Sequence, residues 1–197
     1  MPRRYRAQPA KMIALKLPIP PRRKLDPDLR KYFDLCDEKI GFLPNVLAAY
    51  SFDPTKLRAF MAMYNDLMLA PSGLSKTERE MIAVAVSAQN ECVYCLTAHG
   101  AALRALTGDP ALSETIAQNW RVAALPGRQR AMLGFAVKLT NQPAEIGEAD
   151  RAALRDAGFT DRDIWDIAAV ASFYNMSNRL AAAVEMVPNP EYHAMAR

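Results

Sequence analysis

Residues 91–100 read ECVYCLTAHG, and the rest of the chain is organised around this stretch. It holds two of the three cysteines, Cys92 and Cys95, and one of the two histidines, His99. On a helix, Cys95 and His99 lie one turn apart and share a face. An imidazole beside a thiol is a base that can take the thiol proton and lower the thiol pKa. The stretch therefore predicts a redox-active dithiol with its own proton acceptor.

A helix is predicted immediately before this stretch, from Ser75 to Gln89. Ser75 and Glu78 have the spacing of a capping box, and apolar residues follow them at helical spacing. A second helix is predicted from about Cys92 to Leu106, with the turn near Asn90. The two segments together predict a helical hairpin.

This hairpin brings a carboxylate towards His99. Glu80 lies ten residues before the turn and His99 nine residues after it. At about 1.5 Å per residue, both lie roughly 14 Å from the turn if the helices are antiparallel. We therefore expect Glu80 to contact His99, directly or through a water.

The same residues resemble the motif of a known family. Glu80, the Cys92 and Cys95 pair that begins twelve residues later, and His99 form the motif of the AhpD-like alkylhydroperoxidases, in the carboxymuconolactone decarboxylase superfamily. The segments at 41–45, 74–75, 79–82, 95–100 and 175–179 are similar to its peroxidase-related branch, and the resemblance runs from about residue 27 to residue 187. Decarboxylases proper lack the cysteine pair, so the chain is more similar to the peroxidases.

The resemblance implies an all-α, AhpD-like, homo-oligomeric protein that reduces organic hydroperoxides or hydrogen peroxide. It also implies the roles of the site residues: Cys95 attacks as a thiolate, His99 takes its proton, Glu80 polarises the imidazole, and Cys92 resolves the sulfenic acid as a disulfide. An external dithiol, in the family a lipoyl group on a partner protein, reduces that disulfide. No flavin, haem or metal is implied.

Elsewhere in the chain, further helices are predicted and no alternating strand pattern of useful length is found. Hydrophobic residues make up 51% of the sequence, with many Ala, Leu and Met, which favours helix. Start and stop signals place helices at residues 26–40, 44–50, 53–69, 109–119, 126–140, 148–158 and 160–186. Residues 74–90 and 159–175 can be aligned without a gap as a weak internal repeat, with Trp165 in the position of Glu80. We expect an all-α domain over residues 26–187, with a tail at 188–197.

The last long helix, 160–186, is apolar nearly all round, and Trp165 and Phe173 are among its apolar residues. A helix of this kind must be buried on more than one side. In a chain this small, a subunit interface is the natural partner, which agrees with a homo-oligomer. The polar residues within it, Asn175, Asn178 and Arg179, predict a structural hydrogen-bond network.

The positive charge is concentrated at one end of the chain. The formal net charge is +4, but residues 1–31 hold ten Lys or Arg and two Asp, which leaves 15 basic and 19 acidic side chains in the rest. Residues 1–25 are also rich in proline, so we expect an extended basic arm before a mildly acidic folded body. A nucleic-acid-binding face would need basic residues on one folded surface, and none is predicted.

The chain contains no apolar run long enough to span a bilayer. Residues 12–17 are too short for a signal-peptide core and include Lys16. Three cysteines do not make a disulfide scaffold, and they fit a reducing compartment with one catalytic pair. We therefore expect a cytoplasmic protein without a membrane partner, in which Cys36 and His193 have no role.

Two alternative interpretations stay open. A CxxC pair can be half of a zinc site, but Cys92, Cys95 and His99 supply only three ligands, with poor tetrahedral geometry on a single helix. The pair can also serve a non-enzymatic thiol–disulfide sensor or adaptor, which changes state once instead of turning over. Tyr94, between the cysteines, is equally compatible with lining a pocket and with packing.

Overall fold

The computed structural model describes residues 11–197, and every regular element in that range is a helix. The predicted all-α fold class is therefore confirmed. In chain order the helices are α1 (Pro27–Ile40), α2 (Asn45–Tyr50), α3 (Pro54–Tyr64), α4 (Lys76–Gln89), α5 (Val93–Thr107), α6 (Pro110–Asn119), α7 (Gly127–Asn141), α8 (Glu148–Asp156), α9 (Asp161–Ala183) and α10 (Glu191–Ala194). A π-helical turn, Asn65–Leu69, continues α3. Residues 1–10, the first part of the predicted arm, lie outside the described residues.

The helix starts follow from local chemistry. Asp53 and Asp109 each precede a proline at the first helical position, and their side chains accept hydrogen bonds from amides of the first turn. The capping box predicted for Ser75 and Glu78 begins α4, and a second capping box, of Thr160 with Asp163, begins α9. The helices in the two segments of the weak internal repeat thus both begin with a capping box.

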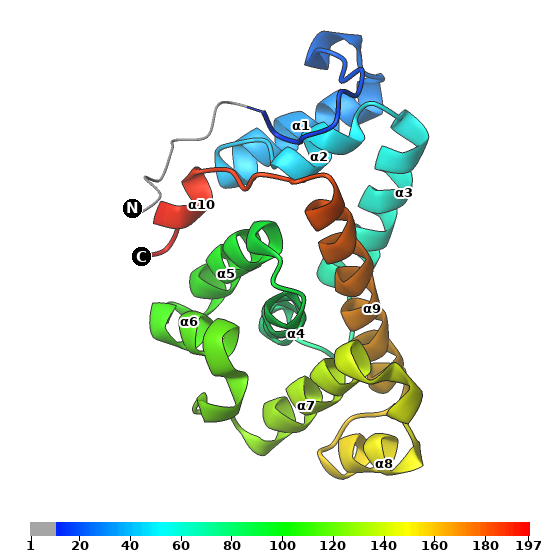
Figure 1. Cartoon of the computed structure of the whole chain (residues 1–197), viewed down its shortest axis with the longest axis vertical. Coiled ribbons are helices and arrows are strands. Elements are labelled where there is room, and N and C mark those ends of the chain that lie inside the picture. Colours follow the sequence, from blue (N-terminus) through cyan, green and yellow to red (C-terminus); the bar gives the residue numbers. More distant parts are fainter. Residues whose placement is uncertain (1–10) are drawn as a thin grey trace, which may run out of the picture.

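Helix α4 is the centre of the fold. Figure 1 looks along it and shows α5, α6, α7 and α9 arranged around it. Residues 78–87 are all buried, and the run from Ile82 to Val86 is completely inaccessible. A helix buried on all sides needs apolar residues around its whole circumference, which the alternation of Ala and Val here provides. Glu80 lies on this buried helix, so its charge needs a partner inside the protein.

The two ends of the described chain pack against each other and on the helices. The Ala14 N–H donates to the Val184 carbonyl at 2.8 Å, and the Val187 N–H donates to the Met12 carbonyl at 3.0 Å. In the segment expected as a tail, α10 lies against α5, and Tyr192 is buried. Residues 11–14 and 184–187 therefore form a closed contact between the chain ends.

Helix α9 is buried against α4, α5 and α7 but keeps large apolar side chains on its outer side. Trp165 is 73% exposed, and Met176 and Leu180 are also exposed.

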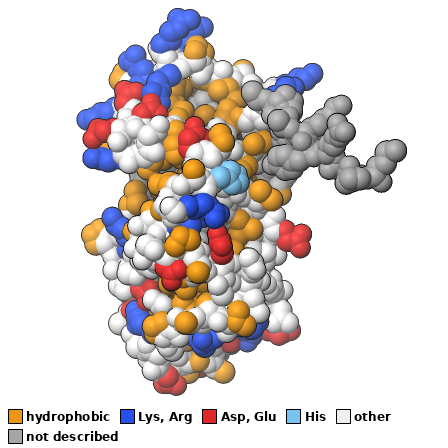
Figure 2. Space-filling view, turned by 90° about the vertical axis from the view of Figure 1, so that its left-hand side faces the viewer, with side chains coloured by type: hydrophobic (Ala, Val, Ile, Leu, Met, Phe, Trp, Pro, Cys, Tyr) orange, Lys and Arg blue, Asp and Glu red, His pale blue; other side chains and the backbone are white. Residues whose placement is uncertain are grey.

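On the face shown in Figure 2, Lys and Arg side chains lie next to Asp and Glu side chains, and hydrophobic side chains lie between them. No helix in residues 11–197 is long and apolar enough to cross a membrane.

Candidate active site

The hairpin between α4 and α5 positions the site. Asn90 ends α4, Glu91 has a φ of +52°, and Cys92 is the N-cap residue of α5. The left-handed conformation at Glu91 is rare for a residue with a side chain, and it reverses the chain within two residues. The Cys92 N–H then donates to the Ser87 carbonyl at 3.0 Å, which closes the turn. The turn predicted near Asn90 is confirmed.

Glu80 and His99 are in direct contact. Glu80 Oε2 lies 2.7 Å from His99 Nδ1, and both side chains are largely buried. Because a carboxylate only accepts hydrogen bonds, Nδ1 carries the hydrogen in this pair, which leaves Nε2 free to accept a proton. The contact predicted from the hairpin geometry is confirmed, and it fixes the orientation of the imidazole.

A third residue, Tyr174 of α9, touches the same imidazole. Its hydroxyl lies 3.3 Å from His99 Nδ1, and the two rings meet edge to face with centroids 4.6 Å apart. Burial raises the pKa of the Tyr174 phenol well above its ordinary value, and the charge of Glu80 adds to this effect. Tyr174 thus stays neutral and packs the imidazole in place. In the sequence Tyr174 is one of many residues of a largely apolar helix, so nothing there indicates its contact with His99.

Both cysteines of the motif are free thiols with almost no exposure, 4% for Cys92 and 2% for Cys95. A hydrogen bond from the Cys95 thiol is the largest of several effects that together lower the pKa of the Cys92 thiol to about 6. Interaction with Cys92, together with burial, raises the pKa of Cys95 well above its ordinary value. We expected His99 to lower the thiol pKa. The larger influence is the neighbouring thiol, because the two sulfurs share one proton.

Polar residues of α9 form the predicted hydrogen-bond network behind the dithiol. Asn90 Nδ2 donates to the Oδ1 atoms of Asn175 and Asn178, both at 2.9 Å. Asn178 Nδ2 donates to Ser87 Oγ at 3.0 Å, and Arg179 donates to the side chain of Asn175 at 2.8 Å. The network joins α9 to the α4–α5 turn. Asn178 also lowers the pKa of both Cys92 and Cys95, so it contributes to the electrostatics of the site.

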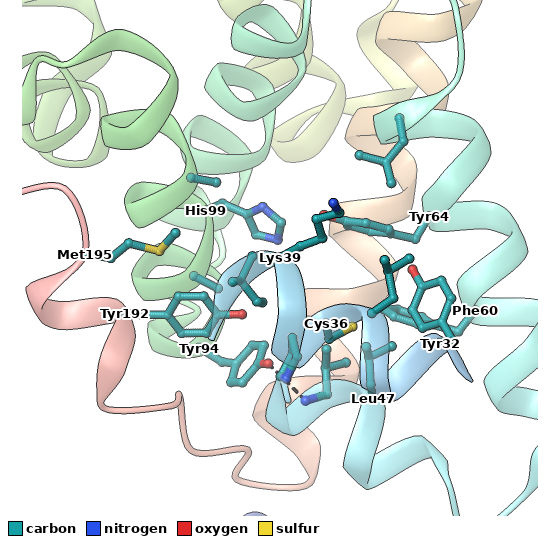
Figure 3. Close-up of a pocket in the computed structure, with 17 residues that line it drawn as sticks. Tyr32, Cys36, Lys39, Leu47, Phe60, Tyr64, Tyr94, His99, Tyr192 and Met195 are labelled. Carbon is teal, nitrogen blue, oxygen red and sulfur yellow. Dashed lines mark hydrogen bonds between the residues drawn. The ribbon is translucent and has the colours of Figure 1, made fainter. Parts of the chain in front are cut away.

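His99 lines a pocket of about 370 Å³ between α1, α2, α3, α5 and the C-terminal segment (Figure 3). Tyr94 also lines it, and the Tyr94 hydroxyl accepts a hydrogen bond from the Val46 N–H at 3.0 Å. Most of the remaining lining is apolar, with Leu47 and Phe60 among it. Neither cysteine lines the pocket: Cys95 lies on α5 one turn before His99, and Cys92 is the N-cap residue of that helix.

Cys36, for which no role is predicted from the sequence, and Tyr192, which carries no signal in the sequence, also line this pocket. Cys36 of α1 lines it, and burial raises the pKa of the Cys36 thiol. Tyr192 lines it from α10. His193, next in the chain, lies at a separate and smaller pocket. Within residues 11–197 no group of three or more His, Cys, Asp or Glu side chains is arranged to hold a metal ion.

The fold and this site define a class of protein. Residues 54–119 match the carboxymuconolactone decarboxylase family. An uncharacterized peroxidase-related protein from Silicibacter sp. TM1040 has 57% sequence identity, with 98% of this chain and 100% of that chain covered and a TM-score of 0.93. The chain belongs to the carboxymuconolactone decarboxylase family, among its peroxidase-related, AhpD-like proteins.

Other similar proteins agree with this assignment. An uncharacterized peroxidase-related protein from Ralstonia eutropha JMP134, described as an alkylhydroperoxidase AhpD core, has 44% identity, with 95% of this chain and 97% of that chain covered and a TM-score of 0.91. The debrominase Bmp8 shares the fold, with a TM-score of 0.75, 18% identity, and 95% of this chain and 97% of that chain covered. No curated protein matches the sequence.

Proposed function

We propose that the protein is a thiol peroxidase that reduces organic hydroperoxides or hydrogen peroxide with the Cys92 and Cys95 pair. The observation that carries this proposal is the 2.7 Å contact between Glu80 and His99, one helical turn from a buried dithiol. An imidazole held by a carboxylate is a stronger base, and its free nitrogen can exchange a proton with a nearby thiol. The match to peroxidase-related proteins supports the same chemistry.

The first step oxidises one sulfur. His99 takes one proton from the pair. The remaining proton rests mainly on Cys95, because the pKa of Cys95 is raised and that of Cys92 is lowered. This proton passes to Cys92, and the Cys95 thiolate then attacks the distal peroxide oxygen. A sulfur–oxygen bond forms as the oxygen–oxygen bond breaks, so Cys95 becomes a sulfenic acid. The proton on His99 passes to the leaving oxygen, which departs as an alcohol or as water.

The second step closes the disulfide. The sulfur of Cys92 attacks the sulfenic sulfur of Cys95, a disulfide forms, and water is released. An external dithiol, such as a lipoyl group on a partner protein, then reduces the disulfide and is itself oxidised. This cycle requires a reducing compartment, so we propose that the protein works in the cytoplasm.

Peroxide consumption at steady state tests the proposal. With dihydrolipoamide as reductant, we expect continuous loss of tert-butyl hydroperoxide in proportion to enzyme, and slower loss with reduced thioredoxin. Cys95→Ser should abolish turnover with both reductants. Absence of turnover with every dithiol, although the wild-type thiols are reduced, would refute a peroxidase.

A second candidate is a thiol–disulfide sensor without turnover. One observation favours it: Ile13 and Met186 pack in the same hydrophobic cluster as Cys92 and Cys95, so a change at the sulfurs reaches the contact between the chain ends. A sensor would consume one peroxide per chain and then stop, even with excess dithiol. The number of peroxides consumed per chain therefore distinguishes the two functions.

A further inference from the structure

The Tyr192 hydroxyl is a polar group that the fold leaves without a partner. Tyr192 is only 9% exposed, and it lines the pocket that His99 also lines. Among residues 11–197 no donor or acceptor is hydrogen-bonded to its hydroxyl or to that of Tyr64, which also lines the pocket, whereas the hydroxyls of Tyr32 and Tyr94 are bonded to Asn65 and Val46. In Figure 3 the Tyr192 hydroxyl points into the pocket, on the same side as His99, and Tyr64 lies across from them.

The position of Tyr192 is held by contacts of its ring and backbone. Its ring meets the ring of Phe42 edge to face, with centroids 4.8 Å apart. Arg104 of α5 is buried, and its Nη2 donates to the Tyr192 carbonyl at 2.8 Å, while its Nε donates to the Met195 carbonyl at 3.0 Å. Because His99 and Arg104 lie on the same helix, α5 fixes both sides of the pocket relative to each other.

We propose that Tyr192 is a substrate-binding residue whose hydroxyl donates a hydrogen bond to the leaving oxygen of the peroxide. This inference rests on the proposed function. Tyr192 and Cys95 belong to the same hydrophobic cluster. As Cys95 forms its bond to the distal oxygen, negative charge develops on the other oxygen, on the side of the sulfur that faces the pocket. A fixed donor beside that oxygen stabilises the transition state more than the ground state. His99 supplies the proton, and Tyr192 supplies only the hydrogen bond.

The phenol is suited to this task because it stays protonated. Burial raises the pKa of Tyr192 above its ordinary value, and the nearby thiols and Glu80 act in the same direction. A neutral hydroxyl that faces the pocket and has no protein acceptor is free to donate a hydrogen bond to a ligand there.

The test compares Tyr192→Phe with wild type in a single reaction of the reduced protein with hydrogen peroxide. Phenylalanine keeps the ring and its contact with Phe42 and removes only an unpartnered hydroxyl, so the variant should fold normally. We expect the rate constant of thiol oxidation to fall roughly 10²-fold, as when one oxyanion donor is removed. Tyr50→Phe is the matched control, because Tyr50 stacks on Phe60 outside the pocket lining. It should react like wild type.

A second measurement separates this role from a general effect on the thiols. Thiolate absorbance at 240 nm and the rate of alkylation by iodoacetamide should be equal in wild type and Tyr192→Phe, because neither needs a donor for a leaving oxygen. Equal peroxide rates, or a loss of alkylation that matches the loss with peroxide, would overturn the role of Tyr192. A wild-type protein that does not react with peroxide would instead overturn the proposed function together with this inference.

Discussion

Glu80 holds Nδ1 of His99, so Nε2 is the nitrogen that is left to accept a proton. Glu80→Gln keeps the shape of the side chain and removes its charge, so the protein should fold but lose the carboxylate that orients the His99 imidazole. We expect the peroxide step to slow by roughly 10²- to 10⁴-fold, the range for loss of acid–base assistance. The measurement is the pH profile of peroxide-dependent thiol oxidation.

The control for this variant is Glu145→Gln, which removes the same charge from an exposed residue. It should leave rate and pH profile unchanged. If Glu80→Gln also matches wild type in both, the contact with His99 has no part in the reaction.

The two cysteines are expected to behave differently when one of them is removed. Cys95 is one turn from His99 and Cys92 nearly two, which favours Cys95 as the attacking sulfur. Cys92→Ser should therefore give one sulfenic acid per site with peroxide, trapped by dimedone and located by mass spectrometry. Trapping in Cys95→Ser instead would reverse the assignment. In the wild type, peptide mapping should find a Cys92–Cys95 disulfide with Cys36 left free.

The thiol pair should also titrate far from the ordinary range. The pKa of Cys92 is lowered from 9.0 to about 6, with the Cys95 thiol as the largest cause. Absorbance at 240 nm should therefore show one thiolate appearing near pH 6, and Cys95→Ala should move that midpoint up towards 9. A wild-type midpoint near 9 would contradict the shared proton.

The lowered pKa of the Cys92 thiol also makes the stability of the folded protein depend on pH. Between about pH 6 and 9 the unfolded Cys92 thiol binds a proton that the folded protein does not, so the free energy of unfolding rises with pH. The gain disappears as pH falls through 6. Above 9 the raised pKa of Cys95 acts in the opposite direction, because the unfolded thiol then loses its proton first. Urea unfolding of the reduced protein at several pH values, with Cys92→Ala as control, measures this slope.

At the scale of helices, the start of α4 is the element most open to test. Ser75 Oγ accepts from the Glu78 N–H at 3.1 Å, and Glu78 accepts in return from the Ser75 N–H at 2.8 Å. Ser75→Ala should lower the free energy of unfolding by about 1 kcal/mol. Ser172→Ala, at an exposed position within α9, is the control and should change stability little. An unchanged urea midpoint for Ser75→Ala would show that the cap contributes nothing.

Local chemistry explains which elements could be predicted from the sequence. Helix α6 was predicted at both ends, with Asp109 and Pro110 as the signal that fixes its start. The contact of Glu80 with His99 was predictable because both lie in one hairpin, at the same depth. Tyr174 was not, since it lies 75 residues from His99 and reaches it only through the packing of α9. Helix α10 has four residues, too few for a periodic signal.

At the scale of the whole molecule, the outer side of α9 predicts self-association. Trp165 is 73% exposed on a helix that also carries exposed Met176 and Leu180. Apolar side chains of this size on one helix favour contact with another copy of the chain. Light scattering at micromolar concentration should give a mass above that of the 21.8 kDa monomer. A clean monomer would contradict the expected homo-oligomer.

The closed contact between the chain ends has a consequence for the speed of recycling. Ile13 and Met186 pack with Cys92 and Cys95, and the thiols are almost fully covered. In the proposed cycle a bulky dithiol must touch a disulfide between these covered sulfurs, and we expect the contact between residues 11–14 and 184–187 to open for that reaction. The observed rate of reduction would then be the rate in the open form multiplied by its population. Recycling would be timed by a local opening equilibrium at the edge of the molecule, with sulfur chemistry setting its upper limit.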